Sequence, residues 1–177
     1  MQLHKEGTEV CIHSRNGADF TARFGVIAHA LALFPAKSAI IDAEVVASNA
    51  AGMPDFHALH GRRASPEHIC CWAFDLLNLN GADLRQLPLI ARRTELEKRL
   101  SRHTAGFIMY SQTFNDAEKL LAECEKRGIE GIVSKRKDAI YRSGKCDWIK
   151  VKTKVWREAN KERGELFNPE KRGRGCR

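Results

Sequence analysis

Apolar residues in this chain mostly run together or alternate with polar ones over short stretches, and fewer of them repeat every three or four positions. The first pattern is typical of strands and the second of helices. Strands are predicted over residues 8–13, 39–47, 68–79, 107–112, 132–135 and 148–152. Helices are predicted over residues 22–34, 88–100, 116–127 and 156–167. Because strands and helices do not alternate regularly, we expect an α+β fold with antiparallel sheets and flanking helices.

Turn residues separate these elements. Residues 16–17, 49–54 and 80–81 have the composition of turns, and Gly128 is placed to end the third helix. A basic tail that contains several glycines closes the chain and is predicted to be disordered. No linker-like stretch marks an internal boundary, and 177 residues are enough for one domain with its own core.

Composition narrows the class of protein. The chain has 30 Lys and Arg against 22 Asp and Glu, which gives a formal charge of +8. A basic surface suits a polyanionic partner such as nucleic acid, although a basic enzyme of another kind has the same charge. The longest apolar run, residues 26–34, is too short to span a bilayer, and the first residues lack the apolar core of a signal peptide. The six cysteines have no metal-ligand spacing and are interpreted as reduced thiols. We therefore expect a cytoplasmic protein with no membrane partner.

Two short strands late in the chain bring charge together. Residues 130–135 read Glu-Gly-Ile-Val-Ser-Lys, and residues 148–152 read Trp-Ile-Lys-Val-Lys. Side chains two apart in a strand share a face, so Lys150 and Lys152 point the same way and need an anion or solvent around them. A solvated lysine pair accounts for this segment as well as an anion site does.

Two strands nearer the start carry further candidates. Glu44 lies in an otherwise apolar strand, where a charge must be paired, bind a metal or lie at the rim of a site. Phe74 lies in a long apolar strand, where it either packs in the core or stacks on a base. Trp72 shares its predicted face, so either aromatic residue could serve the core.

Five segments follow one another in a recognisable order: Ser14-Arg15-Asn16-Gly17, Asp42-Ala43-Glu44, Phe74-Asp75-Leu76-Leu77, residues 130–135 and residues 148–152. In this order they resemble the ATP-dependent DNA ligases, and most of all the ligase module of bacterial end-joining ligases. The resemblance implies the nucleotidyltransferase fold shared with mRNA capping enzymes, in which two antiparallel sheets flank an ATP cleft. It also implies ATP and Mg²⁺ or Mn²⁺ as cofactors, nicked or broken double-stranded DNA as substrate, and end-joining partners such as Ku.

The same resemblance implies roles for individual residues. Phe74 would stack on adenine, Glu44 would lie near the ribose and the metal, and Glu130 would bind the metal. Arg15 would approach the DNA or its 5′-phosphate. The catalytic lysines that surround the α-phosphate of ATP would be Lys135, Lys150 and Lys152.

The lysine that such ligases use as nucleophile lies in a Lys-x-Asp-Gly motif, and these 177 residues contain no such motif. Lys5-Glu6-Gly7 is a superficial echo of it on the far side of the expected position. We expect residues 1–153 to form a partial adenylation domain, truncated or assigned too late at its start. Residues 154–177 are expected to form a helix and a basic tail, in place of the OB-fold domain of the family.

The resulting functional hypothesis is an ATP-dependent DNA ligase domain, active in DNA repair, that cannot adenylate itself alone. The alternative is a non-catalytic remnant that binds DNA or nucleotide on the ligase scaffold. An RNA capping-type guanylyltransferase shares the lysine and glutamate motifs. The Ser-Arg-Asn-Gly, Phe-Asp-Leu-Leu and Trp-Ile-Lys-Val-Lys segments, however, look more like ligases.

Overall fold

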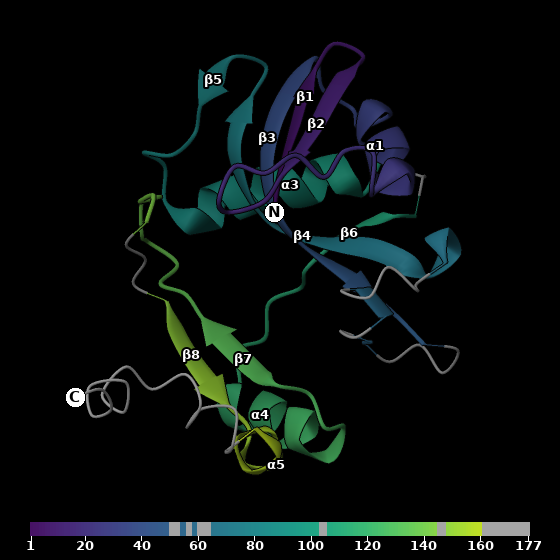
Figure 1. Ribbon diagram of the computed structural model, residues 1–177. Helices are drawn as coiled ribbons and strands as arrows, with labels where there is room; N and C mark the ends of the chain where they lie inside the picture. Colours follow the sequence, from purple (N-terminus) through teal and green to yellow (C-terminus); the bar gives the residue numbers. More distant parts are fainter. Residues whose placement is uncertain (50–53, 56–57, 60–64, 103–105, 145–147, 161–177) are drawn as a thin grey trace, which may run out of the picture. The chain divides into compact units, whose positions relative to one another are not determined.

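The computed structural model describes residues 1–49, 54–55, 58–59, 65–102, 106–144 and 148–160. The chain divides into two compact units (Figure 1). Unit 1 comprises residues 1–112 and 137–146, and unit 2 comprises residues 113–136 and 147–177. The chain passes between the units near residues 112, 136 and 146, and the sequence shows no linker-like stretch at any of these points.

Unit 1 is built on a sheet with the strand order β2-β1-β3-β4-β5, with β6 beside β4. The pairs along this path are antiparallel, and β6 pairs parallel with β4, which departs from the all-antiparallel prediction. The strands are β1 (Gln2–Glu6), β2 (Glu9–His13), β3 (Ser38–Ala47), β4 (Ile69–Leu79), β5 (Ala82–Asp83) and β6 (Ile108–Tyr110). A short 3₁₀ turn, η1 (Pro66–His68), precedes β4.

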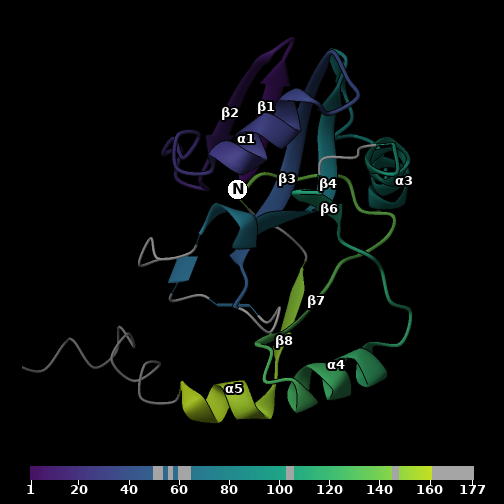
Figure 2. The same ribbon diagram turned by 90° about the vertical axis from the view of Figure 1, so that its right-hand side faces the viewer.

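The core of unit 1 lies between one face of this sheet and helix α1 (Gly25–Ala32), as Figure 2 shows. Helix α3 (Leu89–Leu100) packs against β4 and β6 and adds Leu96 and Leu100 to the same core. The largest side chains without exposed surface in this core are Leu3, Ile12, Ile27, Leu31, Ile41, Leu76 and Leu96. Burial of apolar surface from all these elements stabilises the sheet, and the opposite face of the sheet is left to carry other side chains.

Two irregularities in β4 change which residues share a face. The register with β3 skips Phe74, because Asp42 pairs with Asp75 while Ala43 pairs with Ala73. It shifts again at Leu77. Such bulges re-aim side chains along a strand. Leu76 consequently lies in the core, although simple alternation places it on the same face as Phe74.

Unit 2 contains a two-stranded antiparallel sheet, β7 (Gly131–Ser134) and β8 (Ile149–Lys152), with helices α4 (Ala117–Lys126) and α5 (Lys154–Ala159). Gly131 pairs with Lys152, and the two backbones approach very closely there. Within the described part of unit 2, the buried residues are Cys124 and Thr153.

The predicted elements are confirmed within the described residues, most of them with bounds shifted by one to three residues. The helix expected over residues 156–167 is α5, which begins at Lys154, and the part expected beyond residue 160 lies outside the described residues. The helix expected over residues 22–34 is α1, and the strand expected over residues 8–13 is β2. The strands β1 and β5 were not predicted. The polar loop between β7 and β8 belongs mainly to unit 1, which local sequence did not indicate. Much of the 49–54 turn and the tail beyond residue 160 lie outside the described residues.

None of the described helices is long and apolar enough to cross a membrane. The described cysteines, Cys11, Cys70, Cys71 and Cys124, are free thiols. Burial raises the pKa of the Cys71 thiol to about 12, so this group is not poised to act as a thiolate nucleophile.

Candidate nucleotide site

Unit 2 gathers its lysines on one face of the β7–β8 sheet. Residues 131 and 152 are partners across this sheet, as are residues 133 and 150. Partners share a face, and alternate residues along a strand return to it. This face, here called the lysine face, carries Lys135, Lys150 and Lys152. The sequence-based expectation that Lys150 and Lys152 point the same way agrees with this register.

Two lysines of this face lie against aromatic rings and one against a carboxylate. The Lys135 ammonium is 3.7 Å from the ring centroid of Trp148. The Lys152 ammonium is 3.5 Å from the ring centroid of Trp156, and 3.2 Å from a carboxylate oxygen of Glu130. The structure thus brings Glu130 and Lys152 together. An indole face attracts a cation without neutralising it, so the face stays electropositive.

Thr153 and Glu125 hold the strand β8 to its neighbours. Thr153 is almost fully buried, and its hydroxyl donates to the carbonyl oxygens of Ile129 at 2.9 Å and Glu130 at 3.3 Å. The backbone N–H groups of Lys154 and Val155 donate to the Glu125 carboxylate at 2.9 and 2.8 Å. These bonds lower the pKa of Glu125. The bonds of Thr153 attach the end of β8 to the turn before β7, and the bonds of Glu125 attach the start of α5 to α4.

Unit 1 places Glu44 and Phe74 on the sheet face opposite α1. The residues of β3 and β4 that enter the core alternate with these two positions. Glu44 is exposed and pairs with Trp72, whose side chain is 39% exposed, while Phe74 is half-buried. Both aromatic residues therefore point away from the core, so neither of them serves the core, a role that the sequence allowed for either.

Lys5, the echo of the missing nucleophile, lies on the other side of the same sheet. Its side chain is buried, and its ammonium donates to the carbonyl oxygen of Ala32 at the end of α1. A cation at this end offsets the partial negative charge of the helix C-terminus. Lys5 thus has a structural partner, and it faces α1 while Glu44 and Phe74 face away from it.

Arg15 lies in the exposed turn after β2. The backbone N–H of Gly17 donates to the Ser14 carbonyl at 2.9 Å, and that of Ser14 donates to the Ala18 carbonyl at 2.9 Å. The Ser14 hydroxyl accepts from the Ala18 N–H at 3.1 Å. The turn is therefore ordered by its own backbone, and the arginine side chain remains available to solvent or to a polyanion.

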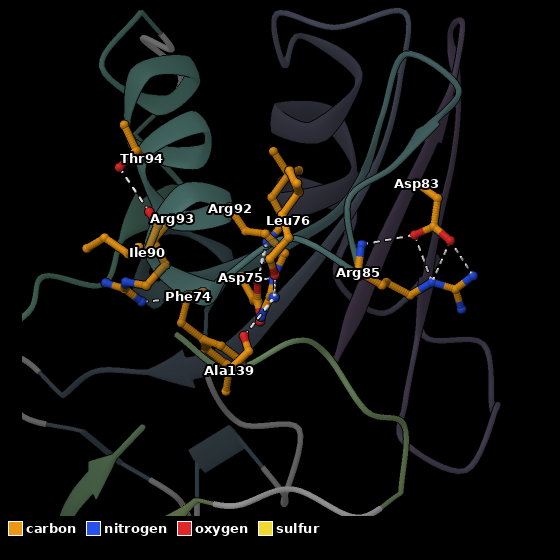
Figure 3. Close-up of polar contacts among 11 residues, drawn as sticks. Phe74, Asp75, Leu76, Asp83, Arg85, Ile90, Arg92, Arg93, Thr94 and Ala139 are labelled. Carbon is orange, nitrogen blue, oxygen red and sulfur yellow. Dashed lines mark hydrogen bonds and ion pairs between the residues drawn. The ribbon is translucent and has the colours of Figure 1, made fainter. Parts of the chain in front are cut away.

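A buried ion pair beneath the Phe74 segment was not found from the sequence. Arg92 of α3 binds both carboxylate oxygens of Asp75, at 2.8 and 2.9 Å, and both side chains are 2% exposed (Figure 3). Arg92 also donates to the carbonyl oxygens of Leu87 and Ala139, at 2.5 and 3.2 Å. Such a charge must be paired, and the pairing anchors residues 137–141 on unit 1.

A second buried carboxylate lies beside this pair. Asp42 is the strand partner of Asp75, and it accepts hydrogen bonds from Tyr141 and Gln2. Burial raises the pKa of Asp42 above its ordinary 3.8, in spite of those bonds. Burial, together with the charge of Asp42, raises the pKa of Tyr141 to about 12. The Tyr141 hydroxyl therefore stays protonated as a donor at neutral pH.

The Asp42→Asn variant is expected to gain stability relative to the wild type as pH rises. Because folding raises the pKa of Asp42, the native state binds this proton more tightly than the unfolded state. The stabilisation from that proton is complete below pH 3.8 and is lost as pH rises through the folded pKa. Denaturant titrations of both proteins from pH 3.5 to 8 measure the difference. A difference that stays constant, or that moves in favour of the wild type, would contradict this account.

Divalent cations of the Mg²⁺ type bind carboxylate oxygens and commonly combine one or two of them with substrate phosphates and water. Glu44 and Glu130 both carry exposed carboxylates and fit this mode. Within the described residues, no three His, Cys, Asp or Glu side chains group in a way that could hold a metal. A cation at either glutamate would therefore take further ligands from substrate and solvent.

The predicted site residues thus fall into two groups. Glu130, Lys135, Lys150 and Lys152 lie together in unit 2, and Arg15, Glu44 and Phe74 lie in unit 1. Sequence reasoning did not select three residues that support these groups, Thr153, Trp156 and Arg92. Thr153 and Arg92 act through contacts with residues far away in the sequence, and Trp156 contacts Lys152 from within a helix. A buried Asp75 in an apolar strand was a signal that a cationic partner existed.

The chain is similar in sequence to known DNA ligases. Residues 1–152 match the family model described as the ATP dependent DNA ligase domain. The multifunctional non-homologous end joining protein LigD of Pseudomonas aeruginosa is 36% identical over 157 residues, which cover 86% of this chain and 19% of that protein. A probable DNA ligase of Dictyoglomus turgidum is 33% identical, over 85% of this chain and 29% of that protein.

Solved structures agree with these matches. The ligase domain of LigD from M. tuberculosis superposes with a TM-score of 0.72 at 30% identity, covering 85% of this chain and 50% of that one. The α+β fold predicted from the sequence is therefore that of these ligase domains. The chain spans only 19 to 50% of the length of the proteins named here.

Proposed function

The chain belongs to the ATP-dependent DNA ligase family, and on this basis we propose that it forms the nucleotide-binding and nick-sealing part of a DNA ligase. The observation that carries the proposal is the lysine face with Glu130 beside it, in a chain that matches the family over residues 1–152. A cluster of cations on one rigid sheet is the chemistry that phosphate recognition requires.

In this proposal each group of residues binds one part of the substrates. The lysine face binds the α-phosphate of ATP, and Phe74 stacks on the adenine ring. Glu44 binds the ribose and a divalent cation, Glu130 binds a divalent cation, and Arg15 binds the DNA phosphate. Bound Mg²⁺ supplies positive charge that offsets the charge on the phosphoryl oxygens.

The step that this chain can perform without the Lys-x-Asp-Gly motif is the sealing of an adenylated nick. The 3′-hydroxyl oxygen attacks the 5′-phosphorus and a P–O bond forms, while the bond to AMP breaks. AMP leaves with the electron pair, and the hydroxyl proton passes to solvent. The lysines of the lysine face stabilise the negative charge that develops on the phosphoryl oxygens.

The test uses a DNA duplex that carries a pre-adenylated nick, in the presence of Mg²⁺. We expect the 177-residue chain to seal it, and Lys152→Met to lower the single-turnover rate about a hundredfold, as removal of one oxyanion-stabilising donor does elsewhere. Lys126→Met is the matched control, because Lys126 is an exposed lysine of α4 that pairs with Glu123. Its rate should equal that of the unmodified chain.

The outcomes separate the hypotheses. If the folded chain binds the nicked duplex without sealing it, the non-catalytic scaffold is the correct alternative. If Lys152→Met and Lys126→Met seal at the same rate, the lysine face has no role in the chemistry. Incubation with ATP and Mg²⁺, followed by intact-mass measurement, tests self-adenylation separately, and an AMP adduct would identify another lysine as a nucleophile.

The biological setting is proposed from the relatives. The Pseudomonas protein is described as a non-homologous end joining protein, so we place this chain in the repair of broken double-stranded DNA in the cytoplasm, with Ku as a partner. The expected division into a partial adenylation domain over residues 1–153 and a helix with a basic tail over residues 154–177 is also a proposal. Pull-down of Ku with the purified chain on DNA ends tests the partnership.

A further inference from the structure

The Lys152 ammonium contacts two side chains of its own unit. The Glu130 carboxylate lies 3.2 Å from it. The ring centroid of Trp156 lies 3.5 Å from the same nitrogen. We propose that Trp156 is a positioning residue, which holds the Lys152 ammonium on the lysine face where it meets the phosphate of the nucleotide. The phosphate in this inference rests on the proposed function, whereas the contact between indole and lysine does not.

Trp156 is suited to this task because its own position is fixed. It lies in the first turn of α5, a six-residue helix that is too short to be stable alone. Thr153 caps the helix by accepting from the Trp156 N–H at 3.4 Å, and it is bonded to the turn that carries Glu130. Glu125 of α4 accepts from the two N–H groups that precede Trp156. The indole is therefore anchored to α4 and to the β7 turn together.

The two neighbours of Lys152 have different consequences for its charge. A lysine has a long flexible stem, so an unrestrained ammonium samples many positions. The Glu130 carboxylate restrains it but also neutralises it, and at 61% exposure that carboxylate can turn to a divalent cation. The Trp156 ring restrains the ammonium and leaves its positive charge intact. If Glu130 turned to a divalent cation, the contact with the Trp156 ring would still restrain Lys152.

A matching pair on the same face supports this reading. The Lys135 ammonium lies 3.7 Å from the ring centroid of Trp148, at the opposite end of the strand pair. Both lysines therefore lie over indole faces supplied from just outside β8, one before it and one after it. Trp148 belongs to the segment that resembles the ligases, whereas Trp156 lies beyond residue 152, where the family match ends.

The experiment compares Trp156→Leu, Trp156→Phe and Val155→Ala in the full chain. Val155 is the matched control, since it neighbours Trp156 on α5 and its side chain is 49% exposed. NMR of ¹³C-lysine-labelled protein reports whether the Lys152 Hε resonances carry the upfield ring-current shift of an overlying indole. Calorimetry measures binding of ATP with Mg²⁺, and adenosine serves as a ligand without phosphate.

We expect Trp156→Leu to abolish the ring-current shift and to weaken ATP binding about tenfold, with adenosine binding unchanged. Trp156→Phe should restore part of both effects, and Val155→Ala should change neither. Unaltered Lys152 resonances in Trp156→Leu would overturn the contact, and equal ATP affinities would overturn its role in binding. If the unmodified chain bound no ATP, the proposed function would fail, and the NMR comparison would still decide whether Trp156 positions Lys152.

Discussion

Replacing Gly131 with alanine is expected to separate β7 from β8 and to destabilise unit 2 by about 3 kcal/mol or more. A Cβ atom at this position would lie 2.1 Å from the carbonyl oxygen of Val151 and 2.7 Å from the Cα of Lys152. Both are backbone atoms of β8, which no side-chain rotation can move. The φ angle of 156° at Gly131 also lies outside the range that residues with a Cβ favour.

Amide hydrogen exchange measures this effect strand by strand. In Gly131→Ala, the amides of β7 and β8 should lose their protection, and sealing of the adenylated nick should be lost with it. Gly128→Ala is the matched control, because Gly128 has a φ of 65° and open space around its Cα. That change should cost about 1 kcal/mol. Equal exchange in the two variants would show that the close approach of β7 and β8 is not required.

Replacing Arg92 with methionine is expected to destabilise unit 1 by about 3–5 kcal/mol, because it leaves the Asp75 carboxylate buried without its cation. Both side chains are 2% exposed, so water cannot replace the lost partner. Arg92 also donates to the carbonyl oxygen of Ala139, so the attachment of residues 137–141 to α3 should weaken. The backbone N–H groups of Leu89 and Ile90, which donate to the carbonyl oxygens of Ala139 and Lys137, should keep part of it. Denaturant unfolding gives the free energy, and exchange of the Tyr141 amide, which donates to Arg85, reports the attachment.

Two further variants separate burial from charge. The exposed pair of Asp83 and Arg85 has a similar geometry, with 2.8 Å between its atoms and side-chain exposures of 48% and 55% (Figure 3). Arg85→Met should leave stability within experimental error of the wild type, because solvent screens exposed ion pairs. Replacing both buried partners, as in Asp75→Leu with Arg92→Met, should recover much of the loss. A double variant as unstable as Arg92→Met alone would assign the effect to packing.

The features that could be predicted from the sequence depend on residues close together along the chain. The shared direction of Lys150 and Lys152 follows from the two-residue period of a strand, and the order of the motifs identified the family. The sheet face on which Phe74 lies was harder to predict. The bulge at that position interrupts the simple alternation of faces and turns Leu76 into the core. The need for a partner for Asp75 could be inferred from its burial. Its identity could not, since Arg92 lies 17 residues away on a helix.

Lys5 illustrates the opposite case. Its sequence neighbourhood echoes a nucleophile motif, and only the position of α1 shows that its ammonium serves a helix end. For Trp156 the sequence predicted only that it begins a helix, and not that it contacts Lys152. Its contact with Lys152 depends on the cap at Thr153, which brings residues four apart in sequence face to face.

The division of the chain into units has a consequence for how such a protein can be inherited. The polypeptide passes between unit 1 and unit 2 three times, near residues 112, 136 and 146. The two strands of unit 2 are thus encoded on either side of a segment that folds with unit 1. A single recombination breakpoint near residue 112 transfers unit 2 only together with residues 137–146 of unit 1. A crossover between β7 and β8 joins half of a lysine face to a foreign partner strand. Lineages that exchange these genes are therefore expected to keep breakpoints outside residues 113–152.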